Sequence, residues 1–234
     1  MIQPVLPTRK DERWKYTNLN SLLSGAWEPA EALDSESLPA RTRFKSFEGE
    51  KSAEIVILNG KFVPEWSTIT LEGLSIKSSP VTKIAAVNAQ TNLPAQETWS
   101  ASYAHELVHI EIKPSAIIKK PIVITTYSFG SESLATLSIA APRVEIKVGK
   151  LAEVAFVEFA AGEGRTLALP STSISVANGA RVSHARINLA QDEASQVGYT
   201  KIDLTRDSFC ETYQFSLTGQ VIREDLDVRL MEPG

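Results

Sequence analysis

Short runs of alternating hydrophobic and polar residues dominate the second half of the chain. This period of two is typical of β-strands, because successive side chains of a strand point to opposite faces. Turn signals such as Pro114, Gly130 and Pro142 separate the runs, and no convincing helical pattern interrupts them. A doubly wound α/β fold is therefore excluded. The predicted strands cover residues 108–112, 122–126, 135–139, 144–148, 154–159, 174–176, 182–189, 202–204, 213–217 and 226–230.

Glycines join three pairs of these strands, at Gly149, Gly179 and Gly219. Such strand–glycine–strand units are typical of the corners of a solenoid, in which one coil stacks on the next. Their unequal spacing gives a loose repeat without a measurable period. The pattern by itself fits an antiparallel sandwich almost as well as a stacked parallel β-helix.

The first hundred residues show a different pattern. A capping signal at Thr8 predicts a short helix that places Trp14 on its apolar face. Asn59-Gly60 lies between apolar runs and predicts a tight hairpin, since this dipeptide tolerates positive φ angles. We divide the chain into an N-terminal helical and hairpin region, residues 1–106, and a β core, residues 107–234.

Composition and charge limit the partners and the compartment. The formal net charge is −4 and no extended basic run is present, so nucleic acid is not expected as a partner. Charges at Arg9 and Lys10 precede any apolar stretch long enough for a signal peptide, and no later stretch approaches about 18 apolar residues, so we expect neither a signal peptide nor a membrane anchor. The single cysteine, Cys210, excludes an internal disulfide and favours a reducing compartment, so we expect a cytoplasmic protein.

One motif suggests a zinc peptidase. His105, Glu106 and His109 have the H-E-x-x-H spacing, which on a helix would place both imidazoles on one face with the carboxylate ready to activate a metal-bound water. However, polar and apolar residues alternate over 108–112 and Pro114 follows, which predicts a strand there. In a strand the two histidines would lie more than about 10 Å apart and could not share a zinc ion.

Other chemistry is sparse along the chain. Outside the H-E-x-x-H motif, His184 and Cys210 are metal candidates, because an imidazole and a thiolate brought together by coil stacking could bind iron transiently. A satisfied histidine and a small buried hydrophobe are the simpler interpretations. No phosphate loop, dinucleotide fingerprint or nucleophile elbow occurs. A carbohydrate-active β-helix would need acids gathered on one strand face, and the acids here are scattered. We assign no catalytic, cofactor-binding or metal residue.

Several motifs in order resemble the SufB/SufD family of iron–sulfur cluster assembly proteins. Trp-Lys-Tyr-Thr at residues 14–17 and the Asn-Gly-x-Phe-Val-Pro-Glu segment at 59–65 are similar to motifs near the start of SufD proteins. Residues 108–124 resemble the first core strands of the family. Residues 177–187 and 223–228 are similar to a later turn and strand. The short leader before Trp14 makes the resemblance to SufD closer than that to SufB.

The resemblance implies a fold and a role. The expected fold is mainly β: a right-handed parallel β-helix with a small N-terminal helical and hairpin segment, incomplete at its C-terminal end because relatives continue further. The expected function is that of a non-catalytic scaffold subunit, not an enzyme, which holds no cofactor stably. By resemblance, its partners are a SufB-like subunit and a SufC-like ATPase, and an iron–sulfur cluster is carried transiently by the full complex. An exposed final strand at 226–230 further predicts self-association.

Overall fold

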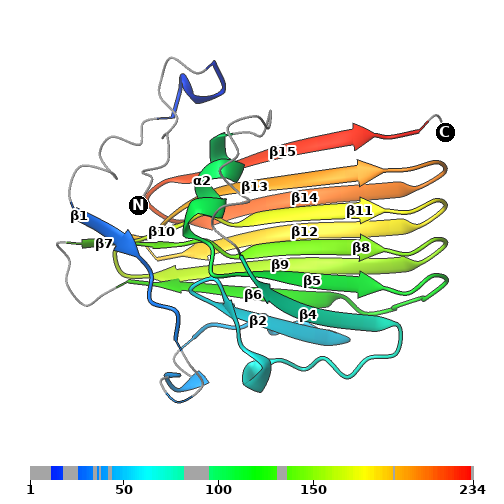
Figure 1. Ribbon diagram of the computed structural model, residues 1–234, viewed down its shortest axis with the longest axis horizontal. Coiled ribbons are helices and arrows are strands. Elements are labelled where there is room, and N and C mark those ends of the chain that lie inside the picture. Colours follow the sequence, from blue (N-terminus) through cyan, green and yellow to red (C-terminus); the bar gives the residue numbers. More distant parts are fainter. Residues whose placement is uncertain are drawn as a thin grey trace.

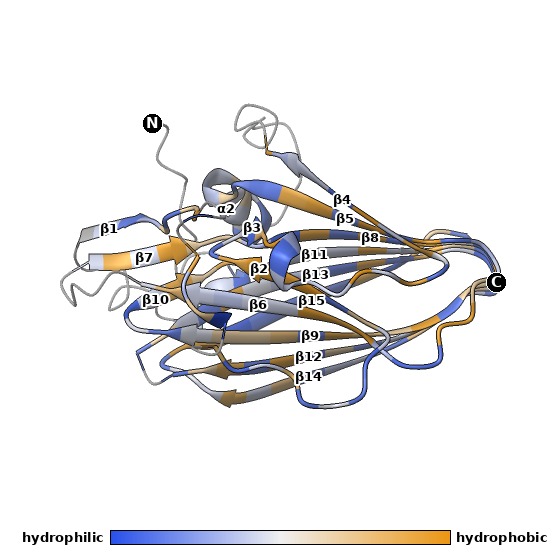
Figure 2. Ribbon diagram, turned by 90° about the horizontal axis from the view of Figure 1, so that it is seen from below, coloured by the Kyte–Doolittle hydropathy of each residue, from blue (hydrophilic) through white to orange (hydrophobic). Residues whose placement is uncertain are grey.

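The structure is a computed structural model that describes residues 12–17, 26–33, 36, 38–41, 44–81, 95–130, 136–191 and 193–232. These residues are mainly in β-strands, as predicted, and form two sheets that face one another (Figure 1, Figure 2). Among them no helix is long and apolar enough to cross a lipid bilayer.

Nine described strands form the first sheet and six form the second. The nine-stranded sheet contains β1 (Ala26–Pro29), β4 (Leu74–Pro80), β5 (Glu106–Ile112), β7 (Thr136–Ala140), β8 (Arg143–Val148), β10 (Thr166–Ala168), β11 (Ser171–Val176), β13 (Ser195–Leu204) and β15 (Ile222–Leu230). The six-stranded sheet contains β2 (Ala53–Leu58), β3 (Lys61–Phe62), β6 (Ile122–Phe129), β9 (Glu153–Glu163), β12 (Arg181–Ala190) and β14 (Phe209–Thr218). The described helices are the 3-10 turns η1 (Glu12–Trp14) and η4 (Pro64–Trp66) and the α-helix α2 (Ala95–Tyr103).

From β8 onward the chain winds back and forth between the two sheets. β8, β11, β13 and β15 lie in the nine-stranded sheet, and β9, β12 and β14 lie between them in sequence but in the other sheet. Each strand pairs in parallel with the strand one coil further on (Figure 1). Among the described strands only β2–β3 and β4–β5 are antiparallel pairs. An antiparallel sandwich, which the sequence pattern left open, is therefore excluded.

The central coils have a constant length that the glycine spacing did not reveal. Glu153 pairs with Arg181, and Arg181 pairs with Phe209, so each coil advances by 28 residues. The first of these corners, where the nine-stranded sheet turns into the other, lies at Leu151 (φ 59°), the next at Gly179 (φ 68°) and the next at Asp207 (φ 57°). Since only one of these three left-handed positions is a glycine, glycines alone could not show the period.

The corners are stacked through their backbones. Leu151 N–H donates to Asn178 C=O at 3.1 Å, and Gly179 N–H donates to Arg206 C=O at 3.1 Å. Gly219 lies at the opposite end of the sheets, between β14 and β15. The loose repeat had suggested that Gly219 is equivalent to Gly149 and Gly179, and this prediction is wrong.

The N-terminal predictions had mixed outcomes. The hairpin is confirmed: β2 and β3 pair antiparallel around Asn59 (φ 49°) and Gly60 (φ 84°). β2 also pairs in parallel with β6 and so extends the six-stranded sheet. The predicted helix is a single 3-10 turn at Glu12–Trp14 where the chain is described, and its cap at Thr8 lies outside the described residues. The pattern missed α2, whose weakly amphipathic sequence carries no clear signal.

Three groups of side chains, two apolar and one polar, fill the space between the sheets. Apolar residues such as Ile112, Val148 and Val176 pack at the end where the sheets converge (Figure 2). A second apolar cluster forms at the open end around Trp99 and Leu167. Buried polar side chains lie between these clusters, and they form the candidate site.

Candidate functional site

The inward face of β12 positions the polar side chains. Along this strand alternate residues are buried, and His184, Arg186 and Asn188 are among them. Because strand side chains alternate between faces, these three point into the interior. They occupy positions at which aliphatic side chains would be expected. Each is at most 1% exposed.

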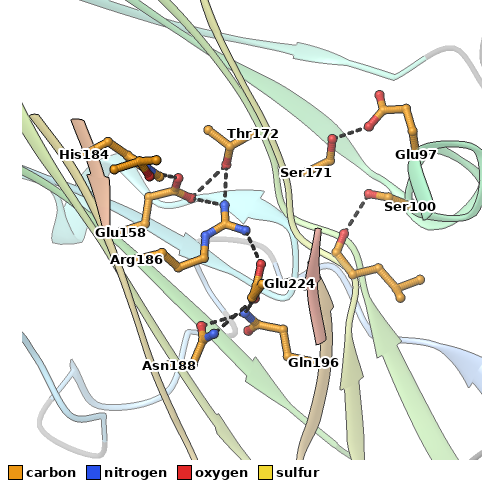
Figure 3. A network of polar contacts seen from close by, with 12 residues as sticks. Glu97, Ser100, Glu158, Ser171, Thr172, His184, Arg186, Asn188, Gln196 and Glu224 are labelled. Carbon is orange, nitrogen blue, oxygen red and sulfur yellow. Dashed lines mark hydrogen bonds and ion pairs between the residues drawn. The ribbon is translucent and has the colours of Figure 1, made fainter. Parts of the chain in front are cut away.

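Arg186 connects β12 to β9 of its own sheet and to β11 and β15 of the facing sheet (Figure 3). Its guanidinium donates to Glu158 Oε2 of β9 at 2.6 Å, to Thr172 Oγ1 of β11 at 2.7 Å and to Glu224 Oε2 of β15 at 2.8 Å. Glu158 is paired with Arg186 in the parallel register, so coil stacking brings the two together. A buried arginine is tolerated because both carboxylates compensate its charge at hydrogen-bonding distance.

The charges in this network are fixed. Burial alone would raise the pKa of Glu158, but the charge of Arg186 and hydrogen bonds from His184 and Thr172 outweigh it and lower the pKa to about 2. Burial disfavours the charged form of Arg186, yet Glu158 and Glu224 hold its pKa above the usual range. At neutral pH Glu158 is therefore an anion and Arg186 a cation.

Glu224 is held by amides as well as by Arg186. Its Oε1 accepts from Asn188 Nδ2 at 3.1 Å and from Gln196 Nε2, and Gln196 also donates to Asn188 Oδ1 at 2.6 Å. The carboxylate occupies the space that a Cβ on residue 198 would need, because Glu224 Oε2 lies against that position. Gly198 thus makes room for the buried acid.

His184, one of the two metal candidates, is fully buried and uses both ring nitrogens. Nε2 lies 2.7 Å from Glu158 Oε1, and Nδ1 lies 2.9 Å from Thr212 Oγ1. A metal ion could bind this imidazole only by displacing one of these partners.

Cys210, the other candidate, is not opposite His184 in the register. Cys210 pairs with Val182, while His184 pairs with Thr212. The Cys210 side chain packs against the apolar cluster near the corners. Burial and then the neighbouring Glu211 carboxylate raise the pKa of its thiol to about 11. The thiolate that would bind iron is therefore scarce at neutral pH. In the described part of the chain no group of three or more potential metal ligands gathers.

The second histidine of the H-E-x-x-H segment lies in a strand, as the alternation predicted. Glu106 and His109 lie in β5, which pairs with β4 and β8. His109 Nδ1 contacts Glu145 Oε2 at 2.7 Å and its Nε2 contacts Ser79 Oγ at 3.0 Å. His105 Nε2 instead contacts Ala30 C=O at 3.0 Å. The helical face that a peptidase zinc site requires is absent from this segment.

The buried network contains residues that sequence reasoning missed. Glu158 and Arg186 stood in predicted strands and Glu224 lay just before the predicted strand 226–230, but nothing in a single strand shows that the three meet. One signal was present: a charged residue at an inward position of an otherwise apolar alternation, as Glu158 is after Val154 and Phe156. All four oxygens of Glu158 and Glu224 have partners, so the arrangement holds charges in place and leaves no open position for a substrate.

Two comparisons with known proteins agree with this picture. Residues 129–234, which include β9 to β15 and thus the whole network, match the sequence model of the family described as SUF system FeS cluster assembly, SufBD core domain. The chain is 24% identical over 238 aligned positions to the iron–sulfur cluster assembly protein SufD of Escherichia coli (strain K12), which covers 98% of this chain. It spans about half the length of that curated relative, 53%. The predicted resemblance is thus confirmed: residues 129–234 match the SufBD core family, and the chain is similar to SufD along nearly its whole length.

Proposed function

We propose that this chain is a non-catalytic scaffold subunit of the SUF system for iron–sulfur cluster assembly, with a role like that of SufD. The observation that carries the proposal is the match of residues 129–234 to the SufBD core, because this segment forms the stacked coils and encloses the buried network. We further propose that the coils form a right-handed parallel β-helix. Parallel strands joined through a second sheet support it, since such crossovers are nearly always right-handed.

The state of the buried acids supports a structural role. Glu158 is 4% exposed and His184 is fully buried, and each is engaged by the other. A general acid or base must reach the proton that it transfers, and a carboxyl with a pKa near 2 is a poor acid at neutral pH. The network is better suited to hold consecutive coils in register than to act on a substrate.

The partners follow from the family resemblance. We propose that the chain associates with a SufB-like subunit and, directly or through it, with a SufC-like ATPase. The iron–sulfur cluster would then be cargo of the complex and not a cofactor of this chain. The single cysteine supports a reducing compartment such as the cytoplasm.

Co-purification tests this function. A tagged form of the chain, produced together with SufB-type and SufC-type subunits, should retain at least the SufB-type subunit through size-exclusion chromatography. The chain alone should neither hydrolyse ATP nor keep iron and sulfide after anaerobic reconstitution. No association with either subunit would contradict the scaffold role. Stoichiometric iron and sulfide that are lost in Cys210→Ser would contradict the absence of a cofactor.

A metal analysis distinguishes the scaffold role from the alternative of a zinc peptidase. The purified chain should contain no stoichiometric zinc and cleave no peptide, because His105 and His109 bond to different partners. One zinc per chain that disappears in His105→Ala would favour the peptidase.

A further inference from the structure

The described N-terminal residues 12–17 contact the strand at the other end of the chain. Trp14 is 2% exposed, whereas its neighbours Arg13, Lys15 and Tyr16 are exposed. This short segment is therefore attached to the rest of the molecule mainly by one side chain. The main receiving strand is β15, which begins some 200 residues later.

Arg223 of β15 covers one face of the Trp14 ring. Its guanidinium carbon lies 4.1 Å from the centroid of the Trp14 ring, within the range of a cation–π contact. The same guanidinium donates to Thr17 Oγ1 at 2.7 Å and to Asp225 Oδ2 at 2.8 Å. Two side chains of the N-terminal segment are thus recognised by one arginine.

The remaining contacts of Trp14 are apolar and come from other elements. Trp14 belongs to a buried cluster with Trp99 of α2, Leu167 of β10 and Val197 of β13, and Val221 packs against it. α2 lies across the strands near the end where β15 begins (Figure 1), and its Gln96 donates to Asp225. The rest of the site is therefore formed by α2, β10, β13 and β15 and not by residues 12–17.

We propose that this surface is a docking site for a tryptophan and that residues 12–17 are its reversible occupant, a clasp that ties β15 to the neighbouring coil and α2. Elements with few buried contacts open locally at much lower free energy than the core. The clasp has one buried side chain and a single 3-10 turn, so it opens without unfolding the sheets. The exposed pair Arg13–Asp227, at 3.5 Å, adds little to its attachment.

Opening of the clasp has a consequence for β15. Among the described strands β15 pairs only with β13 and has a free edge on its other side. The clasp contacts Arg223, in the first part of β15, where it restrains the strand against peeling from the stack. When Trp14 leaves, Arg223 and the apolar cluster around Trp99 and Val197 can bind the same segment of another molecule.

A peptide that carries residues 9–19, labelled with a fluorophore, tests the site in trans on the full chain. Fluorescence anisotropy should show binding to the Trp14→Ala chain at least tenfold tighter than to the unchanged chain, whose own clasp competes. A peptide with alanine in place of its tryptophan should not bind. Adding Arg223→Gln to the Trp14→Ala chain should weaken binding at least tenfold, with far-UV circular dichroism confirming that both chains are folded. Equal binding to the unchanged and Trp14→Ala chains, no binding to folded Trp14→Ala, or no effect of Arg223→Gln would overturn the proposal.

Hydrogen exchange tests the reversibility even if Trp14→Ala does not fold. In the unchanged chain the Thr17 amide, which donates to Trp14 C=O at 3.0 Å, should exchange at least tenfold faster than amides of β11. Thr17→Val should accelerate exchange in the first residues of β15 and leave β11 unchanged. Exchange of Thr17 as slow as that of β11 would mean that the clasp opens only by global unfolding, and the proposal would be wrong.

Discussion

Thr172 of β11 pairs in register with Thr200 of β13, and both side chains are buried in the same interior, yet their hydroxyls differ. Thr172 Oγ1 donates to Glu158 Oε2 at 2.8 Å and accepts from Arg186 at 2.7 Å. Thr200 Oγ1 has no hydrogen-bond partner among the residues that the structure describes. These two paired positions thus provide a matched comparison for measuring what the network contributes to the free energy of unfolding.

Thr172→Val should destabilise the chain by about 1–3 kcal/mol, because it leaves buried charged groups with an unmet hydrogen bond. Thr200→Val should change the free energy of unfolding by less than about 0.5 kcal/mol or raise it slightly, because it removes a buried hydroxyl without a protein partner. Urea unfolding of both variants measures the difference. Equal effects of the two substitutions would show that the network does not depend on Thr172.

Arg186→Met should be far more costly, by about 3–5 kcal/mol, since it leaves the carboxylates of Glu158 and Glu224 buried without their cation. Arg181 on the outer face of the same strand is the control. It is exposed and stacks 4.8 Å from the Phe209 ring centroid, so Arg181→Met should cost less than about 1 kcal/mol. Thermal and urea unfolding that ranked the two variants equally would contradict a stabilising role for the interior arginine.

Acid should weaken the fold through Glu158. Its pKa is about 2 in the folded chain and 4.5 ordinarily, so its stabilisation is complete above about pH 4.5 and is lost as the pH falls toward 2. The difference corresponds to about 3 kcal/mol. Urea unfolding at pH 6, 4.5 and 3 should therefore show a loss that is smaller in Glu158→Gln. If the variant loses stability over this range as steeply as the unchanged chain, Glu158 is not responsible.

Cys210 should react slowly with thiol reagents. A thiol with a pKa of about 11 has roughly a hundredfold less thiolate at pH 8 than one with the ordinary value of 9, and alkylation requires the thiolate. Iodoacetamide labelling followed by mass spectrometry should accordingly be slow in the folded chain and fast in denaturant. Labelling at the rate of free cysteine under native conditions would indicate an activated thiol and reopen the question of a ligand or nucleophile.

The chain should self-associate through β14 and β15. Val228 and Leu230 continue the interior apolar columns of Ile202 and Leu204 but are 51% and 79% exposed. Exposed apolar side chains on an edge strand recruit other chains. Light scattering should therefore detect oligomers that Val228→Lys and Leu230→Lys disperse and that the outward Arg229→Lys does not. A chain that stays monomeric at high concentration, with slow amide exchange in β15, would show that this edge needs no cover.

The local sequence determined most of the secondary structure and contained the motifs that resemble the SufB/SufD family. Each of the ten predicted strands overlaps an observed strand, because alternation reports directly which side chains face the interior. Asn59-Gly60 specified its hairpin through the positive φ angles that it accepts. The strand at Glu106–Ile112 could be distinguished from a zinc-binding helix by the same alternation.

Only the tertiary structure decided which inward residues meet. Alternation places Glu158 and Arg186 inside, but their contact depends on a parallel register between strands 28 residues apart. That register is set by stacking of whole coils, including corners where Leu151 and Asp207 adopt conformations more common for glycine, so no local pattern contains it. The contact of Trp14 with Arg223 has the same origin: residues at opposite ends of the chain become neighbours because winding returns β15 to α2 and the N-terminal segment.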